Sequence, residues 1–198
     1  MLIEQETGYP AEGEVKITIH LNKSESFPLR FRIPSWSMQT EMIVNGDSVY
    51  PEPGEYCIIE RLWKDGDVVE LSLDFSPHFW AGAENRTDHI SVYTGPILLA
   101  VDERFNTIFL KNEVFDLEQM KLDVPTLEMT KTTLELIPEY PEPIVLYTIK
   151  TSGGDEIVLC DFATAGMSGT RYTTWIPATG IQSINYDDGA AKWIGWRK

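Results

Sequence analysis

The sequence predicts an all-β fold, specifically an antiparallel β-sandwich of the jelly-roll-like kind. Three observations lead to this prediction. Apolar and polar residues alternate with a period of two in several segments, whereas helical periodicity is almost absent. Turn residues, mainly glycine and proline, separate these segments. Of the 198 residues, 42% are hydrophobic and 24% are charged, which is ordinary for a globular protein and excludes wholesale disorder.

The alternation is clearest in three segments of the first half, Glu14–His20, Leu29–Ile33 and Val69–Phe75. Each segment places its apolar residues on one side, as expected for a strand with one buried and one solvated face. Between them, Asn45-Gly46 separates two short apolar runs and predicts a tight hairpin. Gly66 provides the positive φ angle for a second turn.

Two prolines, Pro28 and Pro34, flank one of these strands, which limits it at both ends and favours a position at a sheet edge. One short helix is predicted at Glu113–Leu122. Further strands are predicted at Ile90–Tyr93, Ile97–Val101, Thr107–Leu110, Ile144–Lys150, Glu156–Cys160 and Arg171–Ile176.

A domain boundary is predicted between Asp102 and Glu113, because the alternation loosens beyond it and prolines cluster further on. The chain is therefore expected to contain a β-sandwich at residues 1–106 and a β-rich domain at residues 107–198. The pattern leaves open whether the second half forms its own sandwich or extends the first.

The charge balance restricts the partners. The chain has 31 acidic and 16 basic residues and a formal charge of −15, which disfavours binding to nucleic acid and to anionic lipid. No segment has the run of about 20 apolar residues that a membrane helix needs. The N-terminus lacks the features of a signal peptide, and the cellular compartment is left open.

Cysteine, histidine and glycine motifs give no sign of catalysis. The three histidines and the two cysteines lack the spacing of a metal site, and no phosphate-binding loop or nucleophile elbow is present. Cys57 and Cys160 are interpreted as structural. We therefore predict no catalytic residue, no metal ligand and no cofactor.

The strongest candidate for ligand binding is a polar loop near a tryptophan. Tryptophan can stack on a sugar ring, and the loop at 84–89 gathers acidic, amide, guanidinium and imidazole groups. The candidate carbohydrate-binding residues are Trp80, Glu84, Arg86, Asp88 and His89. The alternative interpretation is a solvated connection beside a tryptophan that packs in the core.

A series of motifs with characteristic order and spacing runs through the first half of the chain: Glu6–Pro10, Gly13–Ile17, Leu29–Trp36, Val44–Gly46, Gly54–Tyr56, Arg61–Trp63, Asp65–Asp67 and Tyr93–Ile97. These motifs resemble the middle domain of glycoside hydrolase family 127 (GH127), which contains bacterial β-L-arabinofuranosidases. The motif near the C-terminus, Tyr172–Pro177, resembles the C-terminal domain of the same family.

The resemblance implies that the chemistry of the family is carried by a helical (α/α)₆ barrel, through a cysteine nucleophile beside a zinc ion held by cysteines and a glutamate. Neither Cys57 nor Cys160 matches those motifs. The resemblance therefore implies a non-catalytic β-sandwich portion of a GH127-like enzyme, excised or truncated from a longer polypeptide. Its partner would be the barrel domain, which it would pack on and support.

Two alternatives stay open. A carbohydrate-binding module for arabinose-containing plant polysaccharides would use exposed aromatic rings. A hydrolase in its own right would need paired carboxylates with shifted pKa values in a cleft. The sequence does not identify the sugar, its linkage or the oligomeric state.

Overall fold

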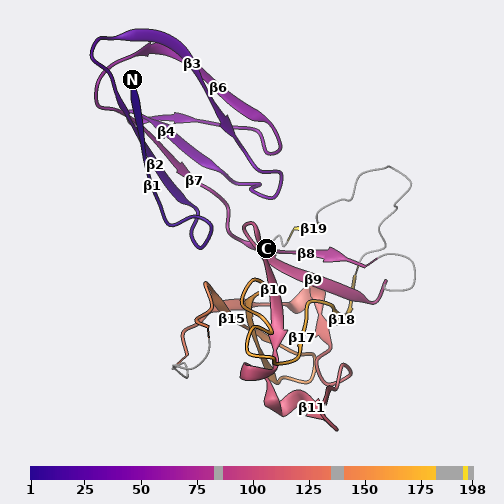
Figure 1. Cartoon of the computed structure of the whole chain (residues 1–198). Helices are drawn as coiled ribbons and strands as arrows, with labels where there is room; N and C mark the ends of the chain where they lie inside the picture. Colours follow the sequence, from indigo (N-terminus) through magenta and orange to yellow (C-terminus); the bar gives the residue numbers. More distant parts are fainter. Residues whose placement is uncertain (83–86, 135–140, 182–193, 196–198) are drawn as a thin grey trace. The chain divides into compact units, whose positions relative to one another are not determined.

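The computed structural model describes residues 1–82, 87–134, 141–181 and 194–195. It consists mainly of strands and confirms the predicted all-β class (Figure 1). The chain divides into two compact units, Met1–Ser76 and Pro77–Lys198. In the described ranges, no helix is long and apolar enough to cross a membrane.

The first unit contains two antiparallel sheets. Five strands pair in the order β1-β2-β7-β4-β5, and β3 pairs with β6 in a separate two-stranded sheet. The strands are β1 (Leu2–Thr7), β2 (Glu14–His20), β3 (Glu25–Arg32), β4 (Glu41–Val44), β5 (Asp47–Val49), β6 (Tyr56–Trp63) and β7 (Asp67–Ser72).

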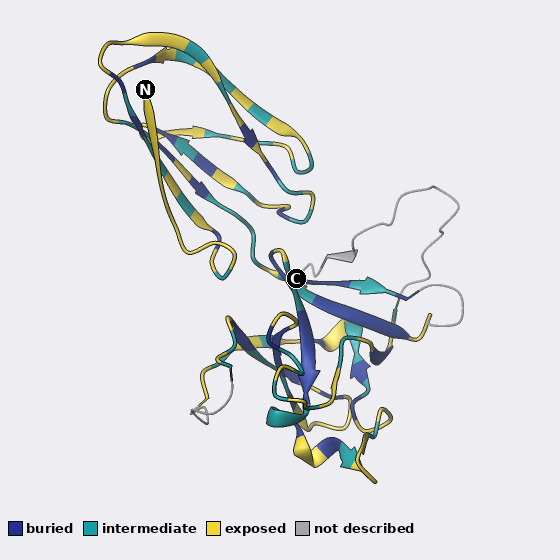
Figure 2. Cartoon of the chain, in the orientation of Figure 1, coloured by how far each residue is buried: buried dark blue, intermediate teal, exposed yellow. Residues whose placement is uncertain are grey.

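Both sheets contribute to one apolar core, so this unit is a β-sandwich. The core residues are Ile19, Leu21, Met42, Val44, Val69, Leu71, Phe31, Ile33 and Trp63. Buried and exposed residues alternate along the strands that flank this core (Figure 2). The fully buried Trp63 donates a hydrogen bond from Nε1 to the carbonyl of Phe27, at 2.9 Å, which satisfies the polar atom of the indole.

The turn chemistry of this unit confirms the predicted hairpin and corrects one strand boundary. β4 and β5 are joined by Asn45 (φ 53°) and Gly46 (φ 89°), the left-handed pair that a tight hairpin requires.

Pro28 does not precede a strand as predicted, because β3 begins at Glu25 and contains it. A proline fits there because β3 has a single partner strand, β6, among the described residues.

The second unit is organised around a larger, mixed sheet of ten strands. Its main path is β13-β18-β9-β10-β16-β15-β14, while β17 pairs with β10, β8 with β9 and β19 with β8; the pairing of β13 with β18 is parallel and the others are antiparallel. The strands are β8 (Pro77–Ala81), β9 (His89–Thr94), β10 (Ile97–Asp102), β13 (Leu122–Asp123), β14 (Met129–Lys131), β15 (Leu146–Lys150), β16 (Glu156–Asp161), β17 (Tyr172–Thr173), β18 (Ile176–Thr179) and β19 (Ile194–Gly195).

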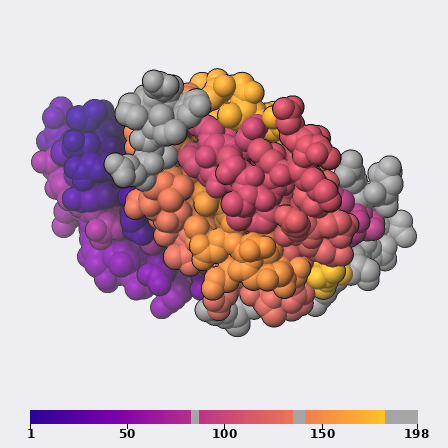
Figure 3. All heavy atoms as spheres, turned by 90° about the horizontal axis from the view of Figure 1, so that it is seen from below, coloured from indigo at the N-terminus to yellow at the C-terminus, as the bar shows by residue number. Residues whose placement is uncertain are grey.

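Short elements complete this unit at the end of β10. Two further strands, β11 (Leu110–Lys111) and β12 (Val114–Phe115), form a hairpin. Three 3₁₀ helices are described, namely η2 (Glu103–Phe105), η3 (Thr107–Phe109) and η4 (Val124–Thr126). From below, the surface of the second unit combines segments from widely separated parts of the sequence (Figure 3).

Two sequence predictions for this unit are wrong. The expected strand Thr107–Leu110 is largely the helix η3, which ends where Leu110 donates its N–H to the carbonyl of Thr107. The expected helix Glu113–Leu122 begins instead with β12. Only one helical turn follows, in which the N–H of Met120 bonds to the carbonyl of Asp116 at 3.3 Å.

The division between the units falls after Ser76, whereas the sequence predicts a boundary after residue 106. Strand pairing explains the earlier position. β10 pairs with β16, with Leu99 opposite Asp161, and β9 pairs with β18. Residues 77–102 therefore share a sheet with segments from much later in the chain.

Candidate functional site

Two of the candidate sugar-binding residues, Trp80 and His89, lie on the paired strands β8 and β9. Trp80 on β8 lies opposite Ser91 on β9, and His78 lies opposite Tyr93. Because side chains alternate along a strand, these four residues and His89 share one face, which we call the Trp80 face. The rings of His78 and Tyr93 stack on it, with centroids 5.5 Å apart and planes inclined by 13°.

An acid–imidazole pair lies at one end of this face. Asp88 Oδ1 is 2.7 Å from Nδ1 of His89, which fixes the orientation of the imidazole ring. The side chain of Asp88 is 72% exposed, whereas His89 is buried. The Nε2 atom of His89 makes no hydrogen bond within the described part of the chain.

The structure brings together part of the predicted set. Trp80 and His89 share the face, and Asp88 adjoins it. Glu84 and Arg86 lie outside the described residues. Sequence reasoning missed His78 and the other two residues of the face, because their position depends on the register of β8 against β9 rather than on any local motif.

The chemistry available on this face is stacking and hydrogen bonding. His78, His89 and Ser91 are buried, whereas Trp80 and Tyr93 are half-buried. The rings of Trp80 and Tyr93 are therefore the ones that can offer a flat surface to a sugar, with the exposed carboxylate of Asp88 at the rim. Among the described residues, the face and its rim hold one carboxylate, that of Asp88, and two imidazoles, those of His78 and His89.

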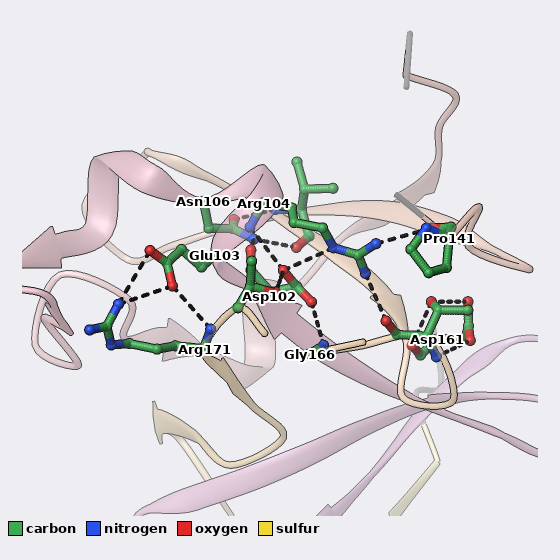
Figure 4. A network of polar contacts seen from close by, with 11 residues as sticks. Asp102, Glu103, Arg104, Asn106, Pro141, Asp161, Gly166 and Arg171 are labelled. Atoms are coloured by element: carbon green, nitrogen blue, oxygen red, sulfur yellow. Dashed lines mark hydrogen bonds and ion pairs between the residues drawn. The ribbon is translucent and has the colours of Figure 1, made fainter. Parts of the chain in front are cut away.

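A second polar cluster, the Asp102 network, lies at the end of β10 (Figure 4). The carboxylate of Asp102 is fully buried. Its Oδ1 atom accepts hydrogen bonds from the N–H of Arg104 at 2.8 Å and the hydroxyl of Thr170 at 2.9 Å. Its Oδ2 atom accepts one from the N–H of Gly166 at 2.8 Å. One carboxylate thus ties together segments more than 60 residues apart in the sequence.

The Arg104 side chain extends the same network and is only 3% exposed. Its Nε atom lies 3.1 Å from Asp102 Oδ1, and its two terminal nitrogens donate to the carbonyls of Pro141 and Thr164. Asp161 accepts bonds from the N–H groups of Ile144 and Thr164 (Figure 4). These bonds are all internal, so the network holds loops in place.

Burial and hydrogen bonds shift the pKa values of one carboxyl group, Asp102, and of the two cysteine thiols. Burial raises the pKa of Asp102, but the hydrogen bonds from Arg104, Gly166 and Thr170 outweigh it and hold the pKa below its ordinary value. Burial, with the negative charge of Asp102, raises the pKa of the Cys160 thiol to about 12. Burial also raises the pKa of Cys57. Both thiols therefore stay protonated at neutral pH, unlike a nucleophilic thiolate.

A metal site needs several histidine, cysteine or carboxylate side chains that converge on one point. Across the described ranges, no group of three or more histidine, cysteine, aspartate or glutamate residues could hold a metal ion. The cysteines lie on different units, Cys57 on β6 and Cys160 on β16.

Comparison with known proteins links this architecture to one family. Residues 1–75 match the family model of the GH127 middle domain of β-L-arabinofuranosidases. A curated ribonuclease HII from Alteromonas mediterranea is 33% identical over 51 residues, which are 26% of this chain and 27% of that protein. So short a match shows neither the fold nor the activity of that relative here.

Three solved structures share the fold over 89% of the chain. They are a glycoside hydrolase (TM-score 0.68, 24% identity), a GH127 β-L-arabinofuranosidase from Geobacillus stearothermophilus T6 (0.70, 20%) and a GH127 β-arabinofuranosidase (0.65, 24%). The chain spans 32%, 30% and 31% of their respective lengths. The match of residues 1–75 agrees with the GH127 middle-domain resemblance drawn from the motifs of the first half, and the fold of the chain is similar to a part of the solved GH127 structures.

Proposed function

We propose that this chain is the non-catalytic β-sandwich portion of a GH127-like glycoside hydrolase, which packs on and stabilises a helical-barrel catalytic domain. The match of residues 1–75 to the GH127 middle domain carries the proposal. The shared fold over 89% of the chain, against about a third of each solved neighbour, supports it.

The chemistry of the described residues supports a structural role. The GH127 resemblance implies a cysteine nucleophile, but the raised pKa values of Cys57 and Cys160 leave both thiols protonated. The deepest carboxylate, Asp102, has its oxygens engaged by neighbouring N–H and hydroxyl groups. We therefore expect the chain alone not to hydrolyse an aryl β-L-arabinofuranoside.

A reconstitution experiment tests the proposal. The helical barrel domain of a GH127 β-L-arabinofuranosidase is produced with and without this chain, and its soluble yield, melting temperature and arabinofuranosidase activity are compared. We expect the chain to bind the barrel and to raise its yield and melting temperature. Turnover by the chain alone, or a barrel that is equally stable and active without the chain, would contradict the proposal.

The Trp80 face favours a second candidate, a carbohydrate-binding module for arabinose-containing plant polysaccharides. It combines an aromatic surface with the exposed carboxylate of Asp88 beside His89. A glycan array with arabinans and arabinogalactans tests this candidate. Specific binding that Trp80→Ala and Asp88→Asn both weaken, while the exposed Trp175→Ala does not, would support it. Absence of binding across the array would remove it.

A further inference from the structure

The outer surface of the two-stranded sheet, β3 with β6, exposes large apolar side chains, whereas a strand pair that faces water usually exposes polar ones. Every second residue of β6 points away from the core, and three of these are large and apolar: Tyr56 is 60% exposed, Ile58 53% and Leu62 51%. Arg32 and Arg30 lie directly opposite the first two on β3. We call these five residues the β3–β6 face.

Arginine is concentrated on this strand pair. Residues 1–76 contain 14 acidic and six basic residues, and their three arginines, Arg30, Arg32 and Arg61, all lie on β3 or β6. The Arg32 guanidinium lies over the ring of Tyr56, 5.8 Å from its centroid. Neither Arg30 nor Arg32 forms an ion pair with another described residue. The cores of protein interfaces are enriched in arginine and aromatic residues and depleted of acidic ones. The fourth outward residue of β6, Glu60, places one carboxylate on this surface, between Ile58 and Leu62.

The outer surface of the five-stranded sheet shows the opposite pattern. There, Lys16 pairs with Glu6 at 3.4 Å, and His20 lies 3.0 Å from Glu4. Charges are matched across neighbouring strands, as in a surface that faces water. The sandwich is thus asymmetric, with one side suited to solvent and the other to a partner.

The composition of the β3–β6 face identifies the partner as a protein. Ile58 and Leu62 have branched aliphatic side chains without the flat ring that stacks on a sugar. The guanidinium groups of Arg30 and Arg32 form no ion pair with another described residue, although Arg32 donates from Nη1 to the carbonyl of Ile33. Guanidinium groups match carboxylates, which they can bind through two parallel hydrogen bonds. The complementary surface therefore has an apolar centre with acidic residues around it.

We propose that the β3–β6 face is the surface through which the first unit docks onto the helical barrel, against an apolar barrel patch bordered by carboxylates. This inference rests on the proposed function and adds to it the surface and the chemistry of the contact. Apolar side chains supply most of the affinity, whereas the arginines set the orientation of the partner and the rate of association.

Two double variants that change the net charge by the same amount, one on the face and one outside it, test the docking surface. In the full-length chain, Arg30→Glu with Ile58→Glu changes one cation and one exposed apolar residue of the face. The control, Lys23→Glu with Leu2→Glu, makes the same changes at exposed positions outside it. Affinity for the purified barrel is measured by calorimetry at two salt concentrations, and circular dichroism checks that both variants are folded.

The outcomes separate this inference from the proposed function. We expect the face variant to bind at least about tenfold more weakly than the wild type, with a smaller dependence on salt, and the control to bind within about twofold of it. If the wild type binds and the face variant binds equally well, the docking surface is wrong and the proposed function stands. If the wild type does not bind the barrel, both fail. A variant Tyr56→Ser, which leaves the charge unchanged, gives the apolar contribution separately.

Discussion

Asp102 is the residue on which the loops of the second unit depend most. Its carboxylate is fully buried, and it accepts bonds from two distant loop positions, Gly166 and Thr170. Arg104 is nearly as buried and depends on it for a counter-charge. Removing one partner of such a pair is costly, because the other charge stays buried without compensation.

We expect Asp102→Asn to lower the free energy of unfolding by about 3 kcal/mol at neutral pH. The folded-state pKa of Asp102 lies below its unfolded value, so its contribution is present above the unfolded pKa, about 4, and is lost as the pH falls through the lower folded value. The difference between wild type and variant should therefore shrink in acid. Urea unfolding from pH 7 to pH 3 measures it, with the exposed Asp155→Asn as control. A difference independent of pH would contradict this assignment.

Among the elements, the β11–β12 hairpin has a turn residue, Glu113, whose backbone conformation is unfavourable for a glutamate. The turn residues Asn112 (φ 50°) and Glu113 (φ 62°) both adopt the left-handed conformation, as a two-residue hairpin loop requires. Asparagine tolerates this region, whereas glutamate does not favour it. The salt bridge from Glu113 to Arg171 is exposed and adds little.

Glu113→Gly is therefore expected to stabilise the chain by about 0.5–1 kcal/mol, since glycine adopts a positive φ angle without steric cost. Thermal unfolding followed by circular dichroism measures the effect. The matched control is Glu128→Gly, at an exposed position without a positive φ angle, where glycine should not stabilise. Equal effects of the two substitutions would show that the turn is not the cause.

The elements that the sequence predicts well are those with local causes. The alternation in Glu14–His20 gives β2 with the same bounds, and Asn45-Gly46 gives the β4–β5 hairpin. Thr107–Leu110 also has a strand-like composition, but it follows Asn106, which bonds to the backbone of Val158 and diverts the chain into 3₁₀ turns. That partner is 52 residues away, so no local pattern could reveal it.

At the scale of the whole molecule, the chain divides into two units because no sheet of the described residues contains strands from both of them. The first unit has its own core around Trp63 and Val69, and the family model ends at residue 75. We expect the fragment Met1–Ser76 to fold alone, with dispersed amide resonances and a cooperative melting transition. The tryptophan fluorescence of Trp63 reports on that core, and Trp63→Phe provides the control. A disordered fragment would show that the first unit needs the rest of the chain.

The candidate site could be predicted only in part, because its residues meet through long-range pairing. Tryptophan and the polar loop draw attention to Trp80 and His89, whereas His78 joins them through the register of β8 and β9. The Asp102 network has no local sequence signature, because the carboxylate of Asp102 on β10 meets Gly166 and Thr170 more than 60 residues later in the chain. Contacts of this kind are specified by the whole fold.

The proline inside β3 has a consequence for behaviour at high concentration. Since β3 and β6 pair only with each other in the described part of the chain, each leaves an open edge that another molecule could extend into a fibril. Pro28 interrupts that edge, because it lacks an N–H to offer to an incoming strand. We expect Pro28→Val to raise thioflavin T fluorescence and to shorten the lag before fibrils form, while Pro53→Val, at a turn outside the strands, leaves both unchanged. A shorter lag for the Pro28 variant alone would show that this proline protects the open edge from fibril growth, apart from any effect on folding stability.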